Sequence, residues 1–80
     1  MAKKSPIIID VRNADEFNKA HAPGSMNIPI NELEDHLDEI KNMKEPVIMV
    51  CGGGTRNKKA QQLLKDKGIE VEAGGSWKSF

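Results

Sequence analysis

The sequence predicts a single α/β domain with a small parallel sheet of about four strands, in three layers with helices on both faces. Two runs of mainly β-branched residues without alternation, Ile7–Val11 and Val47–Val50, are typical of strands covered on both sides. Segments with helical spacing alternate with these strands, and this order favours right-handed crossovers between parallel strands. Eighty residues allow one domain, residues 1–80, with residues 1–5 as an N-terminal tail.

The first half of the chain contains two helix-start patterns. The spacing of Asn13 and Glu16 is that of a capping box and predicts a short helix through Ala20, ended by a Pro-Gly turn at residues 23–24. Residues 26–28 are expected to be extended because a proline follows them. Asn31 and Glu34 repeat the capping-box spacing. A helix after them would carry one apolar stripe, made of Ile30, Leu33, Leu37 and Ile40.

The second half repeats the alternation. The buried strand at residues 47–50 has Cys51 at its carboxyl end, and three glycines follow. A helix from Thr55 or Arg56 to Lys67 is predicted, with Gly68 as its stop signal. Residues 69–72 alternate like a half-exposed strand, and the glycine pair at 74–75 is expected to form a turn toward Trp77.

Composition excludes several classes of protein. Twelve basic and twelve acidic residues give a net charge of +0, so no global charge favours nucleic acid or an anionic membrane as a partner. The apolar run Val47–Cys51 is far shorter than the roughly 20 residues of a membrane span. A single cysteine excludes an internal disulfide and suits a reducing compartment, so we expect a cytoplasmic protein, although a removed leader peptide stays open.

The chemistry gathers in six consecutive residues between the second buried strand and the last helix: Cys51, Gly52, Gly53, Gly54, Thr55 and Arg56. Ligands of open α/β sheets bind beyond the carboxyl ends of strands. Consecutive glycines let backbone N–H groups surround one anion, and a helix N-terminus and an arginine add positive charge. A cysteine in this setting favours its thiolate, so we expect a nucleophilic Cys51 whose pKa lies below the free-thiol value of about 8.5.

Simpler structural roles compete with a functional role for Cys51 and for the other candidate residues. A lone cysteine at a strand end is usually a small buried apolar residue. Asp10 and Arg12 leave the first strand at the same sheet edge and could support the loop, but we favour a helical i,i+4 ion pair between Arg12 and Glu16. His21 and His36 lack ligand spacing with Cys51, so no metal site is expected. The sequence contains neither a phosphate-loop pattern nor a dinucleotide fingerprint, so no cofactor is expected either.

Four segments resemble the rhodanese-like family of sulfurtransferases, in its small single-domain form. They lie in the family's order: Asp10-Val11-Arg12 with Glu16-Phe17, the stretch from His21 to Pro29, the loop from Cys51 to Arg56, and Gly74-Gly75. The resemblance implies a minimal rhodanese-like fold. It also implies sulfur transfer from a donor such as thiosulfate or a persulfide to a thiol or cyanide acceptor, with a protein acceptor also open. Cys51 would carry the sulfur as a persulfide, and Gly52 to Arg56 would bind the donor.

The chain departs from the family pattern at position 52, among other places, and two rival functions stay open. Position 52 is glycine where many thiosulfate-using members carry a cation, which predicts that thiosulfate is a poor donor. A cysteine phosphatase or arsenate reductase would use a similar loop, but phosphatases of this type place five residues between cysteine and arginine, and this chain has four. A non-catalytic sulfur-relay or interaction module is the third hypothesis.

Overall fold

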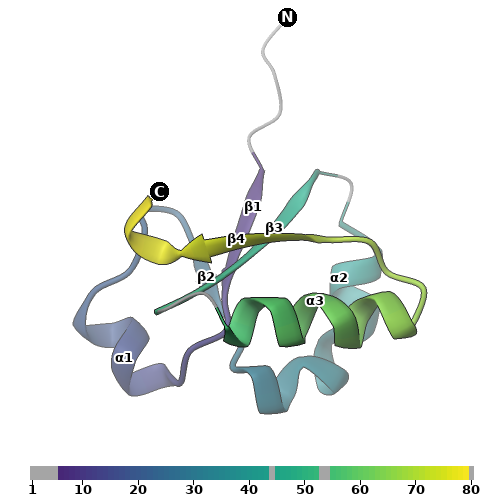
Figure 1. The fold of residues 1–80 in the computed structure, drawn as a ribbon, viewed down its shortest axis with the longest axis horizontal. Coiled ribbons are helices and arrows are strands. Elements are labelled where there is room, and N and C mark those ends of the chain that lie inside the picture. The colour runs from purple at the N-terminus through teal and green to yellow at the C-terminus, as the bar shows by residue number, and fades with distance from the viewer. Residues whose placement is uncertain (1–5, 44, 53–54, 80) are drawn as a thin grey trace, which may run out of the picture.

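The computed structural model describes residues 6–43, 45–52 and 55–79. It contains a four-stranded parallel sheet in the order β2-β1-β3-β4, with helical segments between the strands (Figure 1). The predicted α/β class with a parallel sheet of four strands is confirmed. The elements are β1 (Ile7–Asp10), α1 (Ala14–Lys19), β2 (Met26–Asn27), the 3-10 helix η1 (Ile30–His36), α2 (Leu37–Lys41), β3 (Val47–Cys51), α3 (Arg56–Asp66), β4 (Glu72–Ser76) and the 3-10 helix η2 (Trp77–Ser79).

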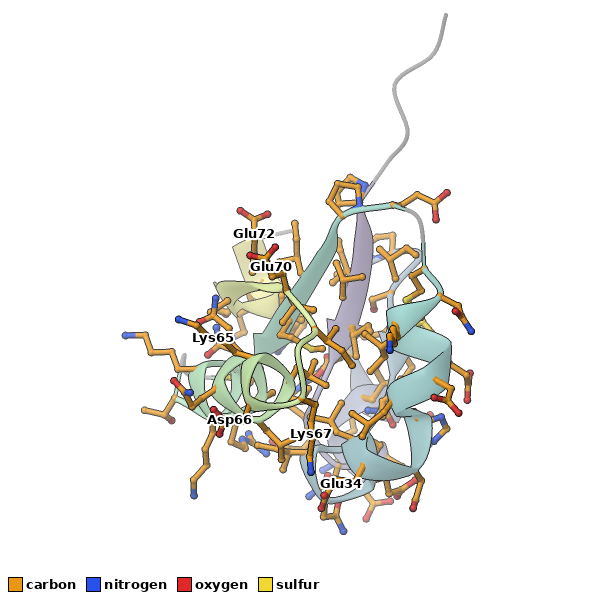
Figure 2. The ribbon with its side chains drawn as sticks, turned by 90° about the vertical axis from the view of Figure 1, so that its right-hand side faces the viewer. Glu34, Lys65, Asp66, Lys67, Glu70 and Glu72 are labelled. Atoms are coloured by element: carbon orange, nitrogen blue, oxygen red, sulfur yellow. The ribbon has the colours of Figure 1, made fainter. Side chains whose placement is uncertain are left out.

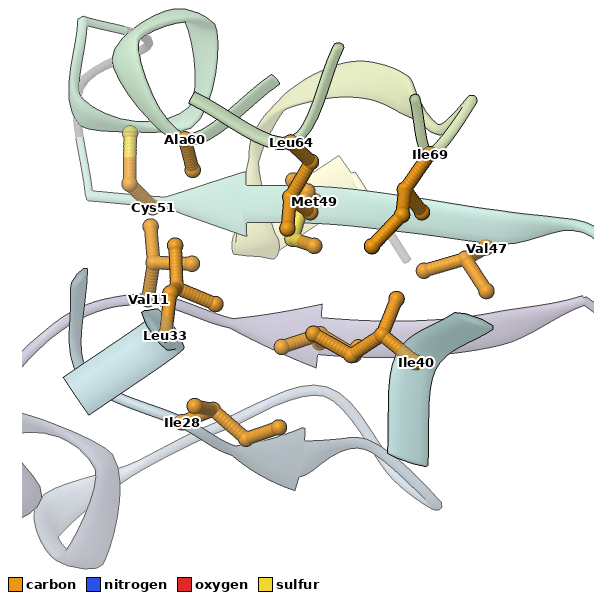
Figure 3. Close-up of a cluster of buried hydrophobic side chains, with 11 residues drawn as sticks. Val11, Ile28, Leu33, Ile40, Val47, Met49, Cys51, Ala60, Leu64 and Ile69 are labelled. Atoms are coloured by element: carbon orange, nitrogen blue, oxygen red, sulfur yellow. The ribbon is translucent and has the colours of Figure 1, made fainter. Parts of the chain in front are cut away.

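The core lies on one face of the sheet. Alternate residues of a strand point to the same face, so odd-numbered positions of β1 and β3 meet the helices there. Their side chains belong to one hydrophobic cluster with buried residues of η1, α2 and α3 (Figure 3). Cys51 is the last residue of this buried stripe, and its side chain points toward α3 (Figure 3). The cluster comprises Ile9, Val11, Ile28, Leu33, Ile40, Val47, Met49, Cys51, Ala60, Leu64 and Ile69.

The opposite face of the sheet is best covered at its carboxyl end. Asp10 and Val50 are neighbours across β1 and β3, and both have no exposed surface. At the amino end, the neighbouring pair Ile8 and Ile48 is only half-buried. The sheet is therefore buried most completely at the end that carries Cys51.

The start of α1 and the end of α3 follow the predicted signals, whereas α1 itself ends at Lys19, before the Pro-Gly turn at residues 23–24. The Asn13 side chain accepts a hydrogen bond from the backbone N–H of Glu16 at 3.1 Å, as an N-cap residue does. Gly68 has a φ of +80° and ends α3. Its N–H donates to the carbonyl of Lys65, and the next N–H, that of Ile69, donates to the carbonyl of Leu64, both at 2.9 Å. This pair of bonds is the Schellman arrangement that favours glycine.

The second capping-box prediction was wrong. The helix begins after Pro29, where the N–H of Glu32 donates to the Pro29 carbonyl at 2.8 Å in a tight 3-10 turn. The N–H of Ile30 donates instead to the carbonyl of Val11 at 3.1 Å, which ties η1 to the end of the first strand. The predicted apolar stripe spans η1 and α2, with Leu33 and Ile40 buried in the core.

The last strand lies farther along the chain than its alternation predicted. β4 begins at Glu72, while Ile69 is 7% exposed and joins the core as the residue after the helix stop. The predicted glycine turn is instead a bulge within β4. Met49 pairs with Ala73 and Val50 with Gly75, so Gly74 is an extra residue, and Gly75 has a φ of +80°.

Charged side chains gather where α3 ends and the chain continues toward β4 (Figure 2). Lys67 Nζ lies 3.9 Å from Glu34 Oε2 and links α3 to η1 across exposed surface. Lys65, Asp66, Glu70 and Glu72 are exposed there as well. Separately, none of the helices that the structure describes is long and apolar enough to cross a membrane.

Candidate active site

Cys51 ends β3, an inner strand of the sheet, between β1 and β4. Its pairing partner in β4 is Ser76, and the preceding residue, Val50, pairs with Asp10. The carboxyl ends of the parallel strands therefore meet around the thiol, as the sequence predicted. Thr55 is exposed, and Arg56 is the first residue of α3 and half-buried. Gly53 and Gly54, which the sequence also assigned to the site, lie outside the described residues.

The Cys51 thiol donates a hydrogen bond to the Asn57 side chain. The Sγ–Oδ1 distance is 3.3 Å, Cys51 has no exposed surface, and Asn57 is 1% exposed. The sequence analysis missed Asn57, although a signal existed. Asn57 precedes Ala60 and Leu64 at the i, i+3 and i+7 positions of one helix face, so the apolar stripe of α3 extends back to it.

Arg56 forms a forked ion pair with Glu16 of α1. Nη1 donates to Oε1 at 2.9 Å and Nη2 to Oε2 at 3.3 Å, and the two side chains are 39% and 40% exposed. The hydrogen bond from Arg56 lowers the pKa of Glu16 below its ordinary value of 4.5. In turn, the bond to Glu16 raises the pKa of Arg56, and the nearby Cys51 contributes in the same direction.

The predicted ion pair between Arg12 and Glu16 was wrong. Arg12 instead pairs with Asp10, through Nε to Oδ1 at 2.9 Å and Nη2 to Oδ2 at 2.7 Å, and Nη2 also donates to the Ala20 carbonyl at 2.7 Å. The helical i,i+4 geometry does not apply because α1 begins only at Ala14. The Arg12 guanidinium carbon also lies 4.7 Å from the centre of the Trp77 ring.

Gly52 lies between the two arginines. A Cβ built on this glycine would lie 3.5 Å from Arg56 Nη2 and 3.7 Å from Arg12 Cδ, which are ordinary van der Waals contacts. Arg12 therefore supports the residue after the cysteine, the role that the sequence analysis ranked second. Both arginines beside Gly52 share their charge with a carboxylate, Asp10 or Glu16.

Both histidines contact residues that are close to them in the sequence. His21 Nδ1 is 2.9 Å from the Phe17 carbonyl oxygen, and its ring stacks on Phe17 with centroids 3.8 Å apart. His36 Nδ1 lies 2.7 Å from Glu39 Oε1. Within residues 6–43, 45–52 and 55–79, no three His, Cys, Asp or Glu side chains are grouped so that they could hold a metal ion.

Comparison with known proteins finds relatives whose names include sulfurtransferase. Thiosulfate sulfurtransferase GlpE from Shewanella oneidensis is 33% identical over 67 residues, which cover 84% of this chain and 65% of that protein. Adenylyltransferase and sulfurtransferase uba4 from Ogataea parapolymorpha is 36% identical over 70 residues, covering 86% of this chain and 18% of that protein. The chain spans less than half of three curated relatives that it matches, namely 34%, 18% and 48% of their lengths.

Solved structures share the fold. A rhodanese with anions from E. coli aligns with a TM-score of 0.82 and 26% identity, over 95% of this chain and 92% of that chain. A rhodanese-like domain protein from Staphylococcus aureus aligns with a TM-score of 0.77 and 33% identity, over 90% and 72%. The family model of the rhodanese-like domain matches residues 1–77. By this match, which spans nearly its whole length, the chain belongs to the rhodanese-like domain family.

Proposed function

We propose that this protein is a sulfurtransferase that moves a sulfane sulfur through a persulfide on Cys51. Membership of the rhodanese-like family and its sulfurtransferase relatives support sulfur transfer in general. The observation that carries the specific proposal is the position of Cys51, at the carboxyl end of β3 and facing the first turn of α3, with Arg56 nearby. A thiolate there is stabilised by the helix N-terminus and by the arginine charge.

The first step loads the sulfur. The Cys51 thiolate attacks the outer sulfur of thiosulfate, a new Sγ–S bond forms, and the S–S bond of thiosulfate breaks. Sulfite leaves with the bonding electron pair, and Cys51 carries a persulfide anion. With a persulfide donor the leaving group is that donor's thiolate. Cys51 has no exposed surface in this structure, so a donor reaches Sγ only after local opening.

The second step unloads the sulfur. A nucleophilic acceptor, either cyanide or a thiolate, attacks the outer sulfur of the persulfide. The Sγ–S bond breaks, and its electrons return to Cys51 as the thiolate. The products are thiocyanate or a new persulfide on the acceptor. A thiol of a partner protein meets the same chemical requirement as a small thiol.

The segment from Gly52 to Arg56 is proposed to bind the donor. Backbone N–H groups at the start of α3 suit sulfite oxygens, and the Arg56 guanidinium adds charge to them. The Arg56 guanidinium already forms an ion pair with Glu16, however, and Arg12 forms one with Asp10. A small dianion therefore competes with these carboxylates, which supports a persulfide as a better donor than thiosulfate.

Intact mass spectrometry tests the proposal directly. Reduced protein is incubated with thiosulfate or with a small-molecule persulfide, beside a Cys51→Ser variant that contains no thiol because Cys51 is the sole cysteine. We expect the native protein alone to gain one sulfur atom and to lose it on addition of cyanide. A folded native protein that gains no sulfur from either donor would overturn the proposal.

The same preparations separate the rival functions. Hydrolysis of a chromogenic aryl phosphate that depends on Cys51 would favour the phosphatase hypothesis. A persulfide that forms but transfers only to a partner protein, and not to cyanide or small thiols, would favour a relay module. We further propose a reducing compartment such as the cytoplasm, where a lone reactive thiol stays reduced. Fractionation of the source cells would test this location.

A further inference from the structure

The thiol that carries the proposed reaction has a buried amide as its hydrogen-bond partner. Cys51 and Asn57 lie at the junction of β3 and α3, and the Sγ–Oδ1 distance is 3.3 Å. Burial of both side chains is nearly complete. A buried amide is costly unless it is hydrogen-bonded, so an asparagine on the apolar face of α3 calls for a specific role.

We propose that Asn57 is a reversible partner of Cys51, accepting a hydrogen bond from the thiol and donating one to the thiolate and to the persulfide. This inference rests on the proposed function, because it takes Cys51 as the nucleophile. It adds a catalytic residue that touches the reacting sulfur. The proposal needs both ends of the carboxamide, and these differ in hydrogen-bond chemistry.

The thiol form matches the geometry in the structure. A neutral S–H donates to Oδ1, as observed. Once the proton leaves, sulfur has nothing to donate, and its negative charge faces the lone pairs of Oδ1. Rotation about the Cβ–Cγ bond of Asn57 exchanges Oδ1 with Nδ2 at almost constant shape, so an N–H then points at the thiolate. Because both side chains are buried away from water, this bond is stronger than it would be in water.

The surrounding charges stay the same when only Asn57 is changed. Arg56 lies on α3, the Asp10–Arg12 pair ends the first strand, Glu16 lies on α1, and Lys78 follows β4 beside Trp77. Variants at position 57 retain all of these groups. A change in the reactivity of Cys51 among such variants therefore reports on the Asn57 contact itself.

The test is the pH profile of Cys51 alkylation, followed by intact mass. Asn57→Asp keeps the shape but offers only acceptors and a negative charge, so we expect the midpoint to rise by about one pH unit or more. Asn57→Ser and Asn57→Ala form an uncharged matched pair that differs by one hydroxyl. A serine hydroxyl both accepts and donates hydrogen bonds. The alkylation midpoint of Asn57→Ser should therefore lie closer to the native midpoint than that of Asn57→Ala does.

Gln61→Glu is the control for charge and for the helix. Gln61 lies one turn farther along α3 and donates from Nε2 to the Val71 carbonyl at 3.0 Å, so its replacement adds the same charge away from the thiol. We expect its midpoint to match the native one. If Asn57→Asp fails to fold by circular dichroism, the comparison of serine with alanine decides. Equal midpoints for serine and alanine, or an Asn57→Asp midpoint equal to that of Gln61→Glu, would overturn the inference.

Alkylation needs no sulfur donor, so this test is independent of the proposed reaction. The Asn57 variants could show shifted alkylation midpoints while the native protein never gains sulfur. That result would support the Asn57 contact and reject the sulfurtransferase proposal. Normal persulfide formation with unshifted midpoints would reject the Asn57 role alone. In the persulfide assay itself, Asn57→Ala should load sulfur several-fold more slowly than Asn57→Ser at neutral pH.

Discussion

Arg12 carries a buried charge at the end of the first strand, and Asp10 balances it. The two side chains are 6% and 0% exposed, and three hydrogen bonds join the guanidinium to the carboxylate. Removing one partner of a buried ion pair leaves an uncompensated charge, whereas replacing both by apolar side chains is often close to neutral. Asp10 thus neutralises the charge of Arg12 and holds its side chain beside Gly52 and Trp77.

Removal of the Asp10 carboxylate should reveal this dependence. We expect Asp10→Ala to lower the free energy of unfolding in urea by about 3–5 kcal/mol. The double variant Asp10→Ala/Arg12→Met should recover a large part of that loss. Asp15→Ala, which removes an exposed carboxylate from α1, should cost far less. A double variant no more stable than Asp10→Ala would show that the buried arginine charge is not the cause.

Residue positions could be predicted from the sequence where one local pattern decides them. A buried strand followed by a glycine-rich segment and a helix placed Cys51 at the carboxyl end of its strand and Arg56 at the start of α3. The partners of these side chains could not be predicted, since Arg56 and Glu16 are 40 residues apart. Asn57 was missed for another reason: its polar side chain hid the helical periodicity that places it in the core.

The bulge in β4 lies just before Trp77, whose ring contacts Arg12 beside the candidate site. Gly75 has a φ of +80°, a conformation that side chains with a Cβ rarely adopt, and Trp77 follows two residues later. The same glycine pair looked like a turn in the sequence, because glycines signal bulges and turns alike. Pairing with β3 decides between the two, and that pairing is not local information.

Substitution of Gly75 isolates the backbone contribution of the bulge. A Cβ at this position meets nothing within 4 Å, so Gly75→Ala changes the backbone preference without a steric clash. We expect a loss of about 1–2 kcal/mol in the free energy of unfolding. The fluorescence of Trp77, the sole tryptophan, follows the transition.

Gly52→Ala is the matched control. Its Cβ would make only ordinary contacts, and the φ of Gly52 lies outside the left-handed region. We expect a change in unfolding free energy well below that of Gly75→Ala. Equal effects of the two substitutions would mean that the left-handed conformation at Gly75 is not what the bulge requires.

At the scale of the whole molecule, segments far apart in the sequence meet around Cys51. The Glu16–Arg56 pair joins α1 to α3, and the contact of Arg12 with Trp77 joins the end of the first strand to η2. The chain has a net charge of +0, so these are local pairings rather than effects of an overall field. We therefore expect part of the stability of the fold to depend on the ion pairs beside the candidate site.

This dependence predicts how stability varies with pH. Arg56 holds the pKa of Glu16 below 4.5 in the folded protein. A carboxylate with a depressed folded pKa stabilises the fold at pH values above its unfolded pKa, and this contribution disappears as the pH falls through the folded pKa. We therefore expect the difference in unfolding free energy between the native protein and Glu16→Gln to be constant from pH 7 to about 5 and to shrink below 4.5.

Urea unfolding of both proteins at several pH values measures this difference. Asp15→Asn, which removes a charge from the same first turn of α1, controls for the general loss of one carboxylate near a helix N-terminus. Both side chains of the Glu16–Arg56 pair are partly exposed, so added salt should also reduce the difference at neutral pH. A difference that persists unchanged down to pH 3 and in high salt would mean that Glu16 stabilises the fold through packing and not through its charge.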